Sequence, residues 1–257
     1  WAGAASGRLR TADKRRRFGQ NRPPSPFRTP TMNMGADGEI LNDAPGVPFL
    51  TCGFFTDGYA AEAAQLRESL DRTGTPYFLK RFASRGYWEA NTRIKPEFLL
   101  DCLRRFPGRD VVYLDADSVV RSPLKLFFDF DADLGVFIAP ADAGMTHRYL
   151  TGTLYLRNTP AMHAFVEDWI AAQDGMVLGV DQDSFTTAVE RHPKLKVGPL
   201  PESYVKIFDR GSETPVVEHF QASRQRVKLQ RTMKKTRNVV LGVVFVAALA
   251  WLITTWL

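Results

Sequence analysis

Residues 111–120 read VVYLDADSVV, an apolar run of strand length that leads directly into two carboxylates one residue apart. In an extended segment, positions i and i+2 face the same side, so Asp115 and Asp117 can point together at one hard cation. Two anionic groups at the mouth of a buried strand are costly unless a cation or hydrogen bonds compensate them. The pattern therefore indicates a divalent metal that also holds a diphosphate, because such a metal keeps open positions for substrate oxygens.

The segments on either side of this motif alternate between strand and helix patterns. We expect strands over 49–55, 76–82, 134–139, 151–157 and 216–220, and helices over 59–73, 88–106, 160–173 and 181–191, with the second helix proper beginning at Pro96. This order predicts a single α/β domain with a mostly parallel central sheet and right-handed crossovers. Ligands in such sheets bind beyond the carboxyl ends of the strands, where Asp115 and Asp117 lie.

The charge of the chain is concentrated at its two ends. The formal net charge is +6, but residues 1–31 carry +7 and residues 221–238 carry another +7, which leaves −8 for residues 32–220. An acidic globular part does not indicate binding to nucleic acid. The two cysteines, Cys52 and Cys102, have no metal-binding spacing, and we expect two buried thiols.

The first 45 residues are basic and rich in proline, a composition that cannot form a core, so we expect residues 1–45 to be disordered. One interpretation is that the native chain begins at Met32 or Met34. The alternative is a basic arm that contacts an anionic membrane or a nucleic acid. Residues 46–222 are then the globular domain.

The last 19 residues, 239–257, read VVLGVVFVAALAWLITTWL and contain no charge. As a helix they would span roughly 28 Å, close to the thickness of a hydrocarbon core of about 30 Å. We expect a transmembrane helix preceded by a basic juxtamembrane stem over 223–238. The positive charge of the stem predicts a single-pass C-terminal tail anchor with the globular domain on the cytoplasmic side of the membrane.

Several short motifs follow one another between residues 50 and 225. They are Thr56 and Tyr59 after the first strand, Lys95-Pro96 opening a helix, Leu114-Asp115-Ala116-Asp117, Thr151-Gly152-Thr153 with Asn158, Asp181-Gln182 and the late His219. In this order they resemble the nucleotide-diphospho-sugar transferases of the GT-A fold, the group around glycogenin-like and related bacterial and phage glycosyltransferases. The resemblance implies a Rossmann-like GT-A domain over 46–222.

The resemblance also implies how the donor diphosphate is held. Asp115 and Asp117 would bind Mn²⁺ or Mg²⁺, with His219 as the third protein ligand, and an imidazole ligand suits Mn²⁺ better than Mg²⁺. Lys95 and Arg224 would neutralise phosphate oxygens. For each of these three residues a role without ligand binding stays open. His219 could be an ordinary surface or core histidine, and Lys95 could be a solvated residue at the start of a helix. Arg224 could simply be one of the basic residues of the stem.

Further residues would contact the nucleotide and the sugar by the same resemblance. Thr56 and Tyr59 would meet the nucleotide, with Tyr59 stacking on the base unless it is a core tyrosine. Residues 151–153 would form a tight wall beside the sugar, where glycine permits close approach. Asp181 and Gln182 would hydrogen-bond sugar hydroxyls, although an N-cap role for Asp181 is an equal alternative.

The stereochemical course stays open. An inverting enzyme would need a base near the acceptor hydroxyl, and Asp181 is the one candidate that the sequence offers; a retaining enzyme would need none. The other histidines, His147, His163 and His192, have no comparable context, and we interpret them as structural.

We therefore expect a metal-dependent hexosyltransferase that moves a sugar from a nucleotide-diphospho-sugar to a hydroxyl acceptor at a membrane surface, with UDP as the family default. The acceptor would be a lipid-linked sugar, a glycan precursor or a protein. One alternative is a phosphatase of the haloacid-dehalogenase type that uses Asp115 as its nucleophile. Another is a non-enzymatic, tail-anchored interaction domain in which the DxD motif is only a capped turn.

Overall fold

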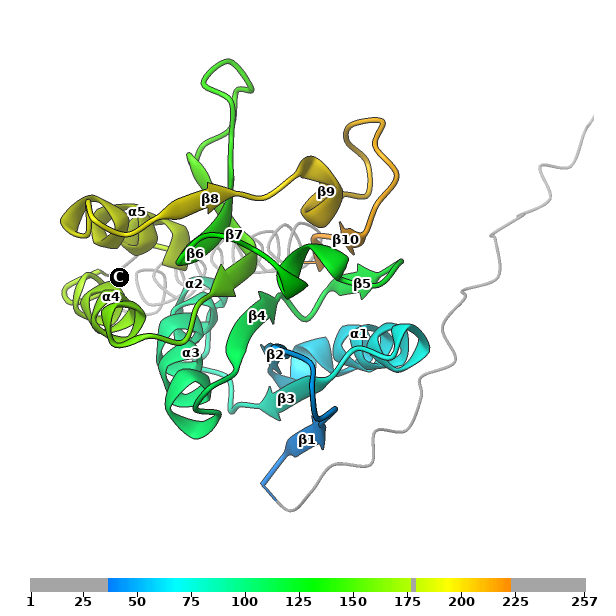
Figure 1. Ribbon diagram of the computed structural model, residues 1–257. Helices are drawn as coiled ribbons and strands as arrows, with labels where there is room; N and C mark the ends of the chain where they lie inside the picture. Colours follow the sequence, from blue (N-terminus) through cyan, green and yellow to red (C-terminus); the bar gives the residue numbers. More distant parts are fainter. Residues whose placement is uncertain (1–36, 177–178, 223–257) are drawn as a thin grey trace, which may run out of the picture.

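The computed structural model describes residues 37–176 and 179–222 (Figure 1). They form one α/β domain built on a large central sheet. The predicted stem over 223–238 and the predicted membrane span over 239–257 lie outside the described residues, as does Arg224. Within the described ranges, no helix combines the length and the apolar character that crossing a bilayer requires.

The central sheet has seven strands in the order β1-β3-β2-β4-β7-β6-β8. Their bounds are β1 Glu39–Asn42, β2 Phe49–Phe55, β3 Tyr77–Arg81, β4 Asp110–Leu114, β6 Leu134–Ile138, β7 Tyr149–Leu156 and β8 Val197–Pro199. Strand β4, which leads into Asp115, lies in the middle of the sheet between β2 and β7. Asp115 and Asp117 therefore follow directly after a central strand of the sheet.

The sheet is mixed, so the prediction of a mostly parallel sheet is wrong. Three neighbouring pairs, β2 with β3, β2 with β4 and β6 with β8, are parallel, whereas β1 with β3, β4 with β7 and β6 with β7 are antiparallel. The antiparallel pairs on this side of the sheet result from the connection between β6 and β7, which follows the motif. No crossover helix joins β6 to β7, so β7 returns antiparallel beside both β6 and β4.

Helices cover both faces of the sheet (Figure 1). Helix α1 (Ala60–Thr73) packs on one face, and α3 (Ile94–Arg105), α4 (Pro160–Ala171) and α5 (Asp181–Arg191) pack on the other. Side chains of β4 alternate between the two cores: Val111 and Tyr113 join the α3 side, and Val112 and Leu114 join the α1 side. This alternation directs Tyr113 and the Asp115 that follows it toward the same side.

A second, three-stranded sheet lies beyond the end of β4. It consists of β5 (Ser118–Val120), β10 (Val217–His219) and β9 (Lys206–Ile207), with β10 antiparallel to β5 and parallel to β9. The sequence predicted a last strand near β10 but neither β5 nor β9. Because His219 pairs with Ser118 in this sheet, the late histidine is brought directly to the motif.

Further elements differ from the predictions, among them β8, which was not predicted. Strand β1 forms within the segment 1–45 that was predicted to be disordered, because Glu39–Asn42 pairs antiparallel with β3 and becomes the edge strand of the sheet. The predicted helix over 88–106 is divided into α2 (Trp88–Thr92) and α3, and α3 begins before Pro96 rather than at it. Proline is tolerated there because the first turn of a helix has no partners for its N–H groups.

The remaining helical turns are η1 (Asp57–Tyr59), η2 (Lys125–Phe128) and η3 (Glu202–Tyr204). Cys52 and Cys102 are both free and fully buried, as expected. Burial raises the pKa of the Cys102 thiol well above its usual range, which suits a packing role rather than a reactive one.

Candidate functional site

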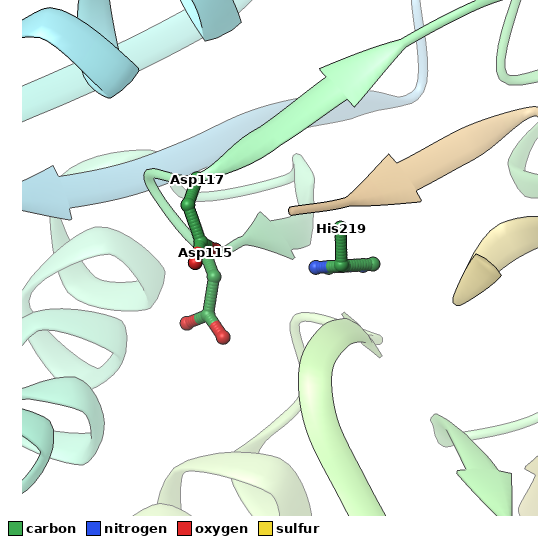
Figure 2. A group of neighbouring side chains, drawn as sticks. All are labelled: Asp115, Asp117 and His219. Carbon is green, nitrogen blue, oxygen red and sulfur yellow. The ribbon is translucent and has the colours of Figure 1, made fainter. Parts of the chain in front are cut away.

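Three metal-ligand groups come together where the two sheets meet (Figure 2). Asp115 follows β4, Asp117 precedes β5, and His219 ends β10. One ligand atom of each lies within 4.8 Å of the others. Two carboxylate oxygens and one imidazole nitrogen form a donor set that suits a divalent cation such as Mn²⁺.

The ring of His219 is held in one tautomer. Its Nε2 lies 2.8 Å from the hydroxyl of Thr153, and that hydroxyl donates its own proton to the carbonyl of Tyr204 at 2.8 Å. The hydroxyl must therefore accept from Nε2–H, which leaves the lone pair on Nδ1, 3.1 Å from Ser118 Oγ. Burial lowers the pKa of His219 to about 4, so the imidazole is neutral as a metal ligand must be.

Gly152 on β7 makes room for these ligands. Its carbonyl accepts a hydrogen bond from the Asp115 N–H at 2.9 Å. A Cβ at this position would lie 3.2 Å from Asp115 Oδ2 and 3.0 Å from Cε1 of His219. Gly152 therefore lies close to the two ligand side chains, and the close approach to a sugar that the resemblance implied stays a prediction.

The carboxylate of Asp117 is poorly hydrated and is repelled by that of Asp115. Burial, and then the charge of Asp115, raise the pKa of Asp117 to about 6, although the Ala222 N–H donates to Asp117 Oδ2 at 2.8 Å. Such an environment favours a bound cation, which would neutralise both groups.

Lys95 lies in a buried network beside the ligands. Its Nζ is 2.7 Å from Asp181 Oδ2 and 3.2 Å from Asp115 Oδ1, and it donates to the Thr151 carbonyl at 3.0 Å. Only 4% of Lys95 is exposed, so the alternative of a solvated helix start is wrong. Burial acts to lower the pKa of Lys95, but the two carboxylates outweigh it and raise that pKa. One ammonium therefore holds two carboxylates in place.

Asp181 is the first residue of α5 and does not cap it. The N-cap is Val180, whose N–H is bound by Asp183 Oδ2 at 2.9 Å, so the alternative role for Asp181 is wrong. Asp181 Oδ2 instead accepts from Lys95 and, at 2.7 Å, from the Thr151 hydroxyl. Oδ2 of Asp181 is therefore already bonded to two donors, an ammonium and a hydroxyl.

A cavity of about 350 Å³ opens in front of these groups. Seven predicted residues line it: Thr56, Tyr59, Lys95, Asp115, Asp117, Asp181 and Gln182. Residues 151–153 and His219 are not part of its wall, although Gly152 and Thr151 contact residues that are. The structure thus brings together, at one site, predicted residues that are dispersed along the sequence, while the roles assigned to them stay predictions.

Several residues of this wall were missed from the sequence, among them Trp88, Asn91, Thr92 and Tyr113. Tyr113 donates its hydroxyl to Asp115 Oδ1 at 2.8 Å, and Lys95 Nζ lies 4.9 Å from the centre of its ring. A tyrosine in an apolar strand indicates a core residue, so only its position two residues before Asp115, on the same side of the strand, could have signalled the contact.

Of the three remaining histidines, His147 lines the cavity, and its interpretation as a structural residue stays a prediction. His163 bonds to Asn158 Oδ1 and His192 to Asp168 Oδ2, at 2.8 and 2.7 Å, and neither belongs to the wall of this cavity. Those two contacts agree with a structural interpretation.

Comparison with known proteins gives a family match over most of the domain. The profile of the nucleotide-diphospho-sugar transferase family matches residues 70–236. No curated protein sequence matches the chain.

Solved structures of glycosyltransferases share the fold. One is the glycosyltransferase involved in glycosylation of the major capsid of PBCV-1, with a TM-score of 0.55 and 13% identity over 70% of this chain and 98% of that one. Another is the apo structure of the bifunctional glycosyltransferase WbbM, with a TM-score of 0.50 and 14% identity over 71% of this chain and 47% of that one. At this identity the similarity supports the fold alone.

Proposed function

The chain belongs to the nucleotide-diphospho-sugar transferase family, and on this premise we propose that it is a metal-dependent glycosyltransferase that uses a UDP-sugar and glycosylates a hydroxyl acceptor at a membrane surface. Family membership makes the chain a nucleotide-sugar-dependent transferase. It argues against both alternatives considered from the sequence, the phosphatase and the non-enzymatic interaction domain.

One observation carries the metal dependence: Asp115, Asp117 and His219 direct ligand atoms to one point beside the cavity. The surroundings fit a divalent cation. Gly152 leaves space next to two of the ligands, and Thr153 fixes the His219 tautomer that has its lone pair on Nδ1. The chemistry that a bound cation supplies is the neutralisation of the diphosphate and of the charge that develops on it during transfer.

The residues of the chain provide the remaining functions. Tyr59 and Thr56 form the part of the cavity wall that we assign to the nucleotide, with Tyr59 presenting a ring for the base. Asp181 and Gln182 are assigned to sugar hydroxyls, and the Lys95 ammonium keeps Asp115 and Asp181 oriented. Arg224, from its place in the sequence, is assigned to the diphosphate.

The proposal is tested by calorimetric titration of UDP, and of GDP in parallel, into the full-length protein with and without Mn²⁺. We expect UDP to bind only with Mn²⁺, and Asp117→Asn to abolish that binding. Asp131→Asn is the matched control, because Asp131 is a highly exposed carboxylate paired with Lys196 outside the cavity wall. If neither nucleotide binds in the presence of metal, the proposed function is wrong. Binding of GDP in preference to UDP would overturn the UDP assignment alone.

The membrane location rests on the sequence of the C-terminal segment, with residues 239–257 as a tail anchor behind a cationic stem. We expect the full-length protein to float with vesicles of phosphatidylcholine and phosphatidylglycerol after alkaline carbonate washing. The double variant Val244→Glu/Ala248→Glu should remain in the soluble fraction, since each acidic residue opposes insertion by about 2.5–3.5 kcal/mol near the helix centre. Equal flotation of both proteins would refute the anchor.

A further inference from the structure

One face of the α2–α3 segment lines the cavity from a buried end to an exposed end. Four residues of the wall lie on it, at positions i, i+3, i+4 and i+7 of a helix: Trp88, Asn91, Thr92 and Lys95. The spacing holds across the two helices because Arg93, which joins them, keeps a right-handed helical conformation. Lys95 is 4% exposed, whereas Tyr87, next to Trp88, is 44% exposed. Trp88 therefore lies at the outer end of this face.

The two tryptophans of the described domain have different environments. Trp169 is fully buried, and its indole N–H donates to the Asp181 carbonyl at 3.1 Å and to Ser184 Oγ at 3.0 Å. Trp88 is only partly buried, and within residues 37–176 and 179–222 neither a hydrogen bond nor a ring contact of its indole is found. A tryptophan usually finds a partner for its N–H when its ring leaves water. Trp88 thus keeps an unused N–H and an unused ring beside the cavity.

The wall of the cavity draws on both sides of the central sheet. Phe55 and Tyr59 pack with the core on the α1 side, and Phe54 and Tyr113 pack with the core on the α3 side. Helix α2 begins at Trp88 and leads into α3, so it belongs to the second side. Since Tyr59 is assigned to the nucleotide, the half of the cavity that contains Trp88 is left for sugars.

Within this half, the donor sugar and the acceptor are separated by depth. The donor sugar is assigned to Asp181 and Gln182, and Asp181 is 4% exposed and bound to Lys95. Trp88 lies two helical turns from Lys95, about 10 Å along the axis and toward the exposed end. The acceptor approaches the donor sugar from the open side of the cavity, so Trp88 is placed to meet the acceptor.

The polar groups around Trp88 fit a sugar ring. The negative face of an indole attracts the partly positive C–H bonds on one face of a pyranose. Asn91 Nδ2 donates one N–H to Ser84 Oγ at 3.2 Å and keeps a second N–H. The Thr92 hydroxyl donates to the Glu89 carbonyl at 2.9 Å and keeps its lone pairs. Sugar hydroxyls satisfy such donors and acceptors, whereas an aliphatic chain would leave them without partners.

We propose that Trp88 is the binding platform for the acceptor and that the acceptor presents a sugar ring. The ring stacks on the indole, and its hydroxyls bond to the indole N–H, to Asn91 and to Thr92. This inference rests on the proposed function and names the class of acceptor within it. A free glycan and a lipid-linked sugar share this chemistry, whereas a serine or threonine side chain of a protein does not.

Acceptor-dependent release of UDP tests the proposal. The full-length protein is incubated with Mn²⁺, with UDP-glucose, UDP-galactose, UDP-N-acetylglucosamine or UDP-xylose, and with one acceptor at a time. The acceptors are methyl and octyl glycosides of glucose, galactose, mannose, N-acetylglucosamine and xylose, and a peptide rich in serine and threonine. We expect a glycoside, and not the peptide, to accelerate UDP release. A lower KM for the octyl glycoside would indicate a lipid-linked acceptor, and equal KM values a free glycan. Acceleration by the peptide alone would overturn the proposal.

Substitutions at Trp88 separate stacking from a structural role. We expect Trp88→Ala to raise the KM for the active glycoside about tenfold or more, because the stacked ring and its burial are lost. The KM for the UDP-sugar and the calorimetric Kd for UDP with Mn²⁺ should stay unchanged. Trp88→Phe should recover part of the loss, since it restores a ring without the N–H. Phe128→Leu is the matched control, because Phe128 is an aromatic residue, 49% exposed, outside the cavity wall.

The possible results distinguish this inference from the proposed function. If UDP fails to bind in the presence of Mn²⁺, the proposed function itself is wrong. If UDP binds but no glycoside accelerates its release, or if Trp88→Ala leaves the KM for the glycoside unchanged, Trp88 is not the acceptor platform. An equal rise in the KM values for the glycoside and the UDP-sugar would place the donor sugar on the ring and would also overturn the inference.

Discussion

Lys95 Nζ lies 2.7 Å from Asp181 Oδ2, which ties the first turn of α3 to the first residue of α5 beside the cavity. The same ammonium lies 3.2 Å from Asp115 Oδ1. Removing it would leave Asp181 as a buried carboxylate for which the Thr151 hydroxyl is the one remaining side-chain donor among the described residues. The stability of the domain and the geometry of the candidate metal ligands are therefore linked through one side chain.

We expect Lys95→Met to reduce the free energy of unfolding by about 3–5 kcal/mol, because breaking a buried ion pair leaves a charge without compensation. Urea denaturation followed by circular dichroism measures the change. Lys80→Met is the control: Lys80 pairs with Glu39 at 3.1 Å but is partly exposed, so the loss should stay below about 1 kcal/mol. Equal losses in the two variants would contradict the buried role of Lys95.

Gly152→Ala should weaken Mn²⁺ binding. The added Cβ would crowd Asp115 Oδ2 at 3.2 Å and the His219 ring at 3.0 Å, and the ring cannot move without losing its bond to Thr153. The electron paramagnetic resonance signal of free Mn²⁺ reports the affinity, for which we expect a loss of about tenfold or more.

Gly198→Ala serves as the control for Gly152→Ala, because its Cβ would also be crowded, at 2.8 Å from Ala132, but away from the ligands. It should lower stability and leave Mn²⁺ affinity unchanged. If both variants bind Mn²⁺ like the wild type, the space that Gly152 leaves beside the ligands is not needed for metal binding.

The periodic spacing of apolar residues predicted the longer helices and strands. The predicted helix over 181–191 coincides with α5, and Gly74 ends α1 in the left-handed conformation, with φ 63°. Strands β5 and β9 contain three and two residues, too few for a period to show, and they form because β10 pairs with both. The direction of β7 depends on long-range pairing, which periodicity does not contain.

Some residues of the candidate site could likewise be predicted from local sequence, and others could not. Asp115 and Asp117 could be predicted because one motif holds both, whereas His147 and Asp183 come from a loop and a helix and approach each other only in the folded chain. The family resemblance implied a phosphate role for Lys95, but its carboxylate partners come from α5 and the end of β4, which no local pattern connects. Such contacts depend on the tertiary structure.

Alkaline pH should destabilise the protein partly through Tyr155. Its hydroxyl donates to Asp110 Oδ2 at 2.6 Å, and burial together with this bond raises the pKa of Tyr155 to about 12. The unfolded value is about 10, so the stabilisation is complete below that pH and is lost as the pH rises through 12. Urea denaturation between pH 9 and 11.5 should show a shallower decline for Tyr155→Phe than for the wild type. Parallel declines would contradict the assignment.

Thr153→Val tests whether the tautomer of His219 matters for metal binding. Valine preserves the shape of threonine but removes the hydroxyl that accepts from Nε2–H, leaving a buried donor without a partner and the ring free to adopt the other tautomer. We expect Mn²⁺ affinity to fall about 10–100-fold, as loss of such outer partners typically does. Thr73→Val is the matched control, since the Thr73 hydroxyl bonds to Ser69 and Leu70 within α1 and to Thr75, away from the ligands. Unchanged Mn²⁺ affinity in Thr153→Val would show that His219 does not bind the metal through Nδ1.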